Sequence, residues 1–270
     1  KVLSPQAMLE RLGDRFKFLR GGPRDLPDRQ RTLQATLDWS YDLLTEAEKP
    51  LFRRLAVFVG GCTLEAADQV CNPPNAESVA PLQCEMLDGL TSLVDKSLLY
   101  QQAGLDGESR FMMLVTIREY ATARLAEGGE EEELRRLHSS YYLALAEQAK
   151  LALKGGDQAL WLHRLETEYD NLRAVLHWAT KRKDHALALS LGVALEPFWD
   201  SRGYASEGSG WLQEILMQSR GLSTMMRANA LNAAGNLAKE QGNYAAARSL
   251  HHEALALRRA LDDKQGIAGS

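Results

Sequence analysis

The sequence predicts a mainly α-helical fold, in which a helical domain with a small β-wing is followed by a solenoid of paired helices. Three observations predict it. Seven of the eight prolines lie at or before Pro81, so the strongest helix breaker is almost absent from the rest of the chain. Apolar and polar residues alternate on both sides of a Gly-containing stretch at 103–108. Small and large residues recur in a helix-pair pattern over 228–257.

The composition is that of a globular protein of about two domains. The chain has 270 residues, of which 45% are hydrophobic and 25% are charged, and its net charge of −4 excludes a strongly basic nucleic-acid coat. The three cysteines, Cys62, Cys71 and Cys84, form no C-x-x-C pair, which favours a reducing cytoplasm over a disulfide scaffold or a zinc site. No apolar run is long enough to cross a bilayer, so we expect no membrane partner.

Short helices are predicted in the first part of the chain. Four apolar residues share one face of the segment 32–44: Leu33, Leu37, Tyr41 and Leu44. Thr45 and Glu48 form a capping-box pattern, and Thr63 is a candidate N-cap. The helices that these signals and the apolar spacing predict cover 46–59, 64–71 and 85–96.

A β-hairpin is predicted after these helices. Leu98 and Tyr100 alternate with polar residues before the loop, and Phe111 and Met113 do so after it. An irregular loop between two helices is the alternative. A helix over 114–125 follows. Short helices, a two-stranded wing and a closing helix in this order describe a winged helix domain, which we place at 32–127.

Stacked helix pairs are expected beyond residue 128. Amphipathic runs predict helices over 130–150, 158–181 and 186–199, with a break in the second of them near Tyr169. We place a helical-repeat domain with a degenerate tetratricopeptide repeat at 128–222. A further repeat is expected at 223–270, where the last residues resemble the start of a truncated next repeat.

The segment 228–257 has the signature of a tetratricopeptide repeat. Gly235 and Ala247 allow the two helices of the pair to approach closely, Gly242 makes the turn, and Tyr244 is expected to fill the gap beside it. A degenerate copy precedes this pair, with small and large residues in corresponding places: Gly203, Ala205, Gly208, Leu212 and Ile215. One such pair cannot bury its own apolar face, so neighbouring pairs must stack on it.

Several phrases of the sequence resemble those of a known family. LDWSYDLL at 37–44, with LF at 51–52 and LAVF at 55–58, resembles the block that opens the winged helix domain of NB-ARC proteins. Other phrases are similar to those of bacterial STAND ATPases of the LuxR and AfsR regulator type: RQRTL at 29–33, LVDKSL at 93–98, TIREYA at 116–121 and LETEYDNLR at 165–173. The resemblance extends over nearly the whole chain.

The resemblance implies an ATP-dependent signalling switch that regulates transcription. The family's P-loop ATPase module comes first, but this chain has no G-x-x-x-x-G-K-[ST] motif. We therefore expect ATP or ADP with magnesium to bind upstream, and only the helical end of that module to lie at 1–31. The family's winged helix carries a Met-His-Asp motif whose histidine contacts the ADP phosphate. Met113-Leu114-Val115 takes that place, and because leucine cannot donate a hydrogen bond, we expect no cofactor-binding residue in this chain.

No catalytic or metal-binding residues are expected. The sequence has no G-x-S-x-G, H-E-x-x-H or G-x-G-x-x-G motif, and its six histidines are scattered. His251 and His252 are adjacent, so they point to different faces of a helix and do not make a metal pair. We therefore expect that this chain is not an enzyme by itself.

DNA reading is one of two functions considered for the winged helix. The helix over 85–96 would be its recognition helix, but it carries three acidic residues against one cation: Glu85, Asp88, Asp95 and Lys96. Arg110 on the wing adds little basic surface, and the phosphates of DNA disfavour such a face. We therefore expect DNA contact only through domains outside this chain.

The other function is that of a regulatory arm. Four polar residues are spaced i, i+3, i+7 and i+10 on the first helix of the repeat: Asn229, Asn232, Asn236 and Lys239. They share one stripe at the expected inner surface of the superhelix, where asparagines can bond an extended peptide. A solvated helix face is the alternative explanation. We expect the repeats to bind a protein or peptide effector and the winged helix to couple this event to the ATPase module, with a passive peptide-binding scaffold as the alternative function.

Overall fold

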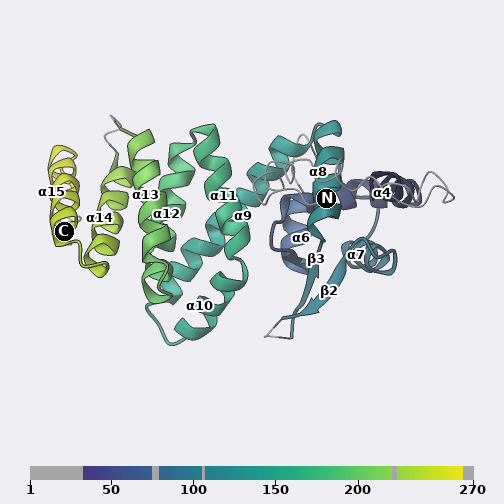
Figure 1. The fold of residues 1–270 in the computed structure, drawn as a ribbon, viewed down its shortest axis with the longest axis horizontal. Coiled ribbons are helices and arrows are strands. Elements are labelled where there is room, and N and C mark those ends of the chain that lie inside the picture. The colour runs from purple at the N-terminus through teal and green to yellow at the C-terminus, as the bar shows by residue number, and fades with distance from the viewer. Residues whose placement is uncertain (1–32, 75–78, 105–106, 221–223, 264–270) are drawn as a thin grey trace, which may run out of the picture. The chain divides into compact units, whose positions relative to one another are not determined.

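The computed structural model describes residues 33–74, 79–104, 107–220 and 224–263 (Figure 1). The stub expected at 1–31 and the truncated repeat expected at the C-terminal end lie outside the described residues. Within these ranges the protein is mainly helical with one small sheet, as the sequence predicts. The chain divides into two compact units, Lys1–Leu137 and His138–Ser270.

The first unit has the order of elements of a winged helix domain. In chain order these are α4 (Leu33–Asp42), α5 (Glu48–Arg54), the 3-10 helix η1 (Leu55–Val57), β1 (Cys62–Thr63), α6 (Leu64–Cys71), α7 (Met86–Asp95), β2 (Tyr100–Ala103), β3 (Ser109–Met112) and α8 (Val115–Glu127). The Thr63 hydroxyl caps α6 by accepting from the Ala66 N–H at 3.1 Å, as predicted. Thr45 and Glu48 exchange both hydrogen bonds of a capping box, at 2.7 and 3.3 Å.

The predicted hairpin is present, and it belongs to a larger sheet than expected. β2 pairs antiparallel with β3, with Gln101 opposite Phe111. β1 pairs with the other side of β3, which gives the strand order β1-β3-β2. Gly61 precedes β1 with a φ of +74°, and a Cβ there would lie 2.6 Å from the carbonyl oxygen of Phe111. Glycine is therefore required for β1 to approach the wing.

The core of the first unit forms where α5, α7 and α8 pack together. Its largest members are almost completely buried: Leu51, Phe52, Leu90, Leu93 and Leu125. Gly89 lets α7 approach α5, because a Cβ at this position would lie 2.5 Å from a methyl group of Leu51. Each buried side chain of this size contributes about 1.5–3 kcal/mol to folding.

A buried arginine joins four segments of the first unit. Arg54 is 1% exposed, and its guanidinium donates to the carbonyl of Cys71 at 2.9 Å and to that of Ala80 at 2.8 Å. It also donates to the Glu130 carboxylate at 2.6 Å, and Arg53 donates to the same carboxylate at 3.0 Å. Burial raises the pKa of Glu130, but the hydrogen bonds and charges of Arg54 and Arg53 outweigh it and hold this pKa below its ordinary value.

The second unit is an array of antiparallel helices. Its elements are most of α9 (Glu131–Ala152), then α10 (Gln158–Thr167), α11 (Tyr169–Arg182), α12 (His185–Ser201), α13 (Ala205–Gln218), α14 (Met225–Glu240) and α15 (Tyr244–Ala260). Helices α11 to α15 lie side by side in chain order (Figure 1), which confirms the predicted solenoid. The break expected near Tyr169 occurs one residue earlier, at Glu168.

Buried hydrogen bonds hold the break at Glu168. The Glu168 carboxylate accepts from the Tyr142 hydroxyl and from the Asn171 amide, both at 2.9 Å. Glu168 and Asn171 are 5% and 0% exposed. Because a buried carboxylate is costly without such partners, these bonds fix the junction of α10 and α11 against α9.

Glycines allow the close helix contacts that the repeat pattern predicts. A Cβ at Gly235 of α14 would lie 2.7 Å from the ring of His251 on α15. A Cβ at Gly208 of α13 would lie 2.5 Å from the ring of Trp199 on α12. These positions therefore need glycine for the helices to pack as they do.

The expectation for Tyr244 is wrong. Its side chain is 70% exposed, and no heavy atom of the described residues lies within 4 Å of a Cβ built at Gly242, where the gap was expected. Tyr244 is the first residue of α15, and a helical side chain is directed back toward the N-terminus of its helix. The Tyr244 side chain is therefore directed away from the contact between α14 and α15.

Four helices of the second unit end in the same backbone motif. After α12 and α14, the left-handed residues are Gly203 (φ +76°) and Gly242 (φ +74°), both predicted turn glycines. After α11 and α15, Lys183 (φ +60°) and Asp262 (φ +53°) take this place. In each case the next N–H bonds back to a carbonyl of the last turn, which is the Schellman pattern. A residue with a Cβ is strained in this conformation by about 1–2 kcal/mol.

We predict that Lys183→Gly stabilises the second unit by about 0.5–1 kcal/mol, because relief of the left-handed strain exceeds the added entropy of the unfolded chain. The Lys183 side chain is exposed. Urea unfolding followed by circular dichroism measures the change. As the matched control, Gly203→Ala should destabilise the same unit. A Lys183→Gly variant that is less stable than the parent chain would contradict the left-handed strain assigned to Lys183.

We predict that Glu130→Gln destabilises the first unit by about 3 kcal/mol or more, because it leaves the buried charge of Arg54 uncompensated. Thermal unfolding measures the change. Glu127→Gln is the matched control, since Glu127 pairs with Arg124 at the surface with a 59% exposed side chain and should change stability by less than about 1 kcal/mol. Equal effects of the two variants would refute the role given to Glu130.

Candidate functional site

Helix α7 takes the position of the recognition helix in this winged helix domain. Its outward residues, with the preceding residue Glu85, are acidic, apolar or neutral: Glu85, Leu87, Asp88, Thr91 and Asp95 are all exposed. Leu87, in the first turn of α7, is 54% exposed. The three predicted acidic residues therefore do face solvent together.

The two basic residues that the sequence places on this surface are both engaged within the fold. Lys96 forms an ion pair with Glu48, whose carboxylate also accepts from Ser92. Arg110 is 7% exposed, and its guanidinium donates to the carbonyls of Gly60 at 2.8 Å and of Gly61 at 3.1 Å. Arg110 is thus buried, whereas the Lys96 side chain stays 34% exposed in its ion pair.

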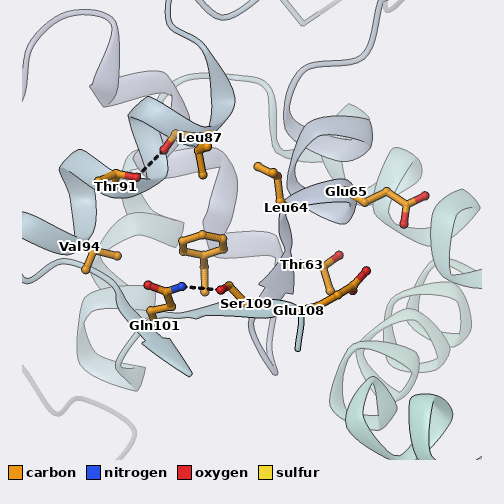
Figure 2. A pocket seen from close by; sticks show the side chains of 10 residues that line it. Thr63, Leu64, Glu65, Leu87, Thr91, Val94, Gln101, Glu108 and Ser109 are labelled. Atoms are coloured by element: carbon orange, nitrogen blue, oxygen red, sulfur yellow. Dashed lines mark hydrogen bonds between the residues drawn. The ribbon is translucent and has the colours of Figure 1, made fainter. Parts of the chain in front are cut away.

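A pocket lies beside α7, and we call it the wing groove. It has a volume of about 380 Å³, and its apolar members are Leu64, Leu87, Val94 and Phe111. Figure 2 shows Leu64 and Leu87 on one side of it, and Gln101 and Ser109 of the wing on the other, joined by a hydrogen bond. Helices α6 and α7 and the wing thus enclose a mainly apolar opening.

Two carboxylates border the wing groove. Glu65 from the first turn of α6 and Glu108 from the residue before β3 line it. In Figure 2 both side chains lie on the side opposite to Val94. Together with Asp88 and Asp95 on α7 they give this face a negative potential.

Leu114 takes the place of the histidine in the Met-His-Asp motif of the NB-ARC proteins that the sequence resembles. Leu114 lies just before α8 and is 54% exposed, and Val115 is 50% exposed. Both side chains are aliphatic and offer no hydrogen bond to a phosphate.

The asparagine stripe of α14 is partly engaged by its neighbours. Asn229 accepts from Arg258 at 3.0 Å, and Asn232 lies 3.1 Å from a ring nitrogen of His251, both on α15. Asn236 donates to Glu196 of α12 at 3.0 Å. Asn229 and Lys239 are exposed, and the other two are half-buried. The stripe is therefore only partly open to solvent, and its role in partner binding stays a prediction.

A second pocket, which we call the repeat groove, adjoins the stripe at Asn229. It has a volume of about 470 Å³ and lies among α9, α12 and α14, with the lining residues Glu147, Lys150, Leu151, Leu189, Ser190, Val193, Ala194, Met226 and Asn229. Leu151 and Met226 are 73% and 41% exposed. The repeat pattern of the sequence does not include α9, so it does not predict that α9 lines this groove. The amphipathic spacing of 130–150 predicts the helix itself but not its place in the groove.

Two ionisable groups near the repeat groove have shifted pKa values. Burial lowers the pKa of Lys150, although the charge of Glu196 opposes this shift. Burial raises the pKa of Glu196, against the hydrogen bond from Asn236 and the charge of Lys150. The groove thus combines an apolar wall with partly desolvated charges of both signs.

The described residues lack the features of a metal site and of a membrane span. Among them, no group of three or more His, Cys, Asp or Glu residues is placed to hold a metal ion. No helix within the described ranges combines the length and the apolar character needed to cross a bilayer.

The comparisons with known proteins identify the first domain. A family model for the winged helix-turn-helix domain matches residues 44–126. The chain is 40% identical over 235 residues to a candidate HTH-type transcriptional regulator of Mycobacterium tuberculosis, Rv0890c, and equally to Mb0914c of Mycobacterium bovis. Each match covers 86% of this chain and 26% of the relative, so the chain spans about a quarter of the length of these relatives.

Two further similarities are more distant. An uncharacterized protein of Mycobacterium tuberculosis, Rv0894, is 34% identical over 132 residues, which are 48% of this chain and 32% of that protein. The crystal structure of the STAND protein with a tetratricopeptide repeat sensor PH0952 from Pyrococcus horikoshii aligns with 98% of this chain and 52% of its own. The TM-score of this alignment is 0.31 at 14% identity. This chain is therefore a winged helix protein with helical repeats that is related to candidate transcriptional regulators.

We predict that Glu48→Gln reveals a pH-dependent contribution to the stability of the first unit. Burial raises the pKa of Glu48, but hydrogen bonds from Lys96, Ser92 and Thr45 outweigh it and lower the pKa from 4.5 to about 2. A lowered folded-state pKa stabilises the protein above the unfolded value, and this stabilisation is lost as the pH falls from about 4.5 to about 2. The variant should be less stable by about 2–3 kcal/mol at pH 7.

Urea unfolding at several pH values measures this difference, which should shrink toward zero near pH 2. Glu46→Gln is the matched control, because the Glu46 side chain is 87% exposed in its pair with Lys49 and should change stability little at any pH. A difference between the parent chain and Glu48→Gln that does not vary with pH would contradict the assignment.

Proposed function

We propose that this chain is the regulatory and sensor portion of a STAND-type signalling ATPase that controls transcription. The helical repeats bind a protein or peptide effector, and the winged helix couples this event to an ATPase module outside the chain. In this proposal ATP or ADP with magnesium is held by that module, and the chain itself has no catalytic residues. DNA is contacted by domains other than this winged helix.

The observation that carries the proposal is the character of the α7 surface. Three acidic residues and an exposed leucine occupy it, while Lys96 and Arg110 are bound within the fold. DNA binding depends on cations that neutralise phosphates, and a surface of this kind repels the duplex. A winged helix with such a face is suited to contacts between protein domains.

The relatives and the sequence phrases support a role in transcription control. The name of the mycobacterial relatives describes HTH-type transcriptional regulators, and this chain corresponds to about a quarter of their length. The phrases at 37–44 and 165–173 resemble those of STAND regulators. The remaining length of such relatives is sufficient for an ATPase module and a DNA-binding domain.

The repeat groove supports the effector-binding part of the proposal. Exposed Leu151 and Met226 provide apolar contacts, and Lys150 and Asn229 provide charge and hydrogen bonds beside them. Concave apolar pockets with a few polar groups are typical binding sites. The stripe of Asn232, Asn236 and Lys239 continues along α14 and would bond the backbone of an extended peptide, with the two asparagines exchanging their contacts to His251 and Glu196.

DNA reading by the winged helix is the second candidate. The match to the winged helix-turn-helix family over 44–126 favours it, because domains of this kind place a helix in the major groove. DNA reading requires exposed cations on α7, whereas the regulatory function does not, so a titration with duplex DNA distinguishes the two candidate functions.

We predict that the 270-residue chain binds neither duplex DNA nor ATP with magnesium. Fluorescence anisotropy with a labelled 30-base-pair duplex at low salt should show a dissociation constant weaker than about 100 µM, since α7 lacks cations that face solvent. Calorimetric titration with magnesium ATP should show no heat of binding, since Leu114 offers no donor.

A charge-reversed variant provides the positive control for the DNA titration. Asp88→Lys combined with Asp95→Lys adds two cations to the exposed face of α7 and should increase affinity for the duplex at low salt. Micromolar DNA binding by the parent chain that is lost in Thr91→Ala would favour the second candidate. Micromolar ATP binding would place the nucleotide site within this chain and refute the proposal.

A further inference from the structure

The wing groove exposes apolar side chains where a DNA-reading domain would expose polar ones. Leu87 and Leu64, which line it, are 54% and 38% exposed, and Tyr100 of the adjacent strand is 43% exposed. A duplex offers little apolar surface beyond thymine methyl groups. Clustered apolar side chains on a domain surface are instead typical of sites for protein contacts.

The charges around the groove determine what kind of segment fits it. Glu65 and Glu108 line the groove, and Asp88 and Asp95 flank it on α7. Lys96, which follows the last residue of α7, forms an ion pair with Glu48. Potentials across a specific interface are complementary, so an acidic border selects a positively charged occupant.

The shape of the groove suits side chains that enter from outside. Val94 and Phe111 lie deeper than the leucines, and Phe111 is 5% exposed, so the apolar surface continues from the rim into the domain. A volume of about 380 Å³ is at the lower end for ligand pockets and accommodates a small number of large apolar side chains. The neutral polar residues Gln101 and Ser109 form the wall on the wing.

We propose that the wing groove is a docking site for a basic protein segment that inserts large apolar side chains between α6, α7 and the wing. Leu87 and Leu64 provide the apolar contact, and Glu65 and Glu108 bind the flanking cations. The winged helix thus receives a protein segment on the face that related folds use for DNA. This inference shares one premise with the proposed function, namely that the α7 face does not bind DNA.

The test uses the full 270-residue chain and a fluorescein-labelled 16-residue amphipathic peptide of leucine and lysine. We expect saturable binding, weakened about ten-fold by Leu87→Ser, as for the loss of a central apolar anchor. Glu108→Gln should weaken it about two- to three-fold, with a loss of salt dependence. A matched peptide with glutamate in place of lysine should not bind.

Matched variants elsewhere in the chain control for non-specific adhesion. Leu160→Ser removes a 49% exposed leucine of α10, and Asp42→Asn removes an exposed carboxylate at the end of α4. Neither should change the affinity. Circular dichroism should show that Leu87→Ser keeps its fold, because Leu87 is more than half exposed.

The outcomes distinguish this inference from the proposed function. Equal affinity of the parent chain and Leu87→Ser, or equal binding of the acidic peptide, overturns the inference. If the peptide fails to bind and duplex DNA also fails, the inference is wrong and the proposed function stands. If DNA displaces the peptide with micromolar affinity, both fail. If sedimentation shows a dimer that Leu87→Ser dissociates, the occupant is a second copy, which also overturns the inference.

Discussion

The buried guanidinium of Arg54 is the constraint on which the winged helix domain depends. It holds the end of α6, the carbonyl of Ala80 and the carboxylate of Glu130 around α5. A guanidinium removed from water is tolerated only when its donors are satisfied and its charge is paired. The segment through Ala80 leads into α7, so these bonds also determine where α7 lies on the domain and hence where the wing groove forms.

The placement of cations explains why this winged helix has an acidic face. Arg54, Arg110 and Lys96 each bond to carbonyls or carboxylates of the fold, whereas Asp88 and Glu108 face solvent. The two buried arginines therefore contribute to stability and little to the outer potential, and the charge of Lys96 is offset by Glu48. Counting charges over 85–96 predicts the acidic face of α7, but it does not show which cations bond within the fold, because that depends on contacts between distant segments.

Local signals predicted most of the fold, whereas the sites depend on contacts between distant segments. The cap at Thr63 is a local contact, and the close approach at Gly235 follows from the spacing of the repeat pattern, so the sequence predicts both. β1 has two residues and no alternation, and its pairing with β3 is visible only in three dimensions. The stripe of Asn229 to Lys239 was predicted from helical period, but its bonds to α12 and α15 were not, because they join residues 19 or more positions apart.

The short edge strand β2 has a consequence for association between molecules. It lies at the end of the order β1-β3-β2, and all four of its residues are exposed, including Gln101 and Gln102. An edge strand with unpaired backbone groups can template the growth of intermolecular sheets, and brevity and polar side chains reduce this hazard. The domain can therefore expose the apolar wing groove next to β2 with a reduced risk that β2 strands of neighbouring molecules pair into a common sheet.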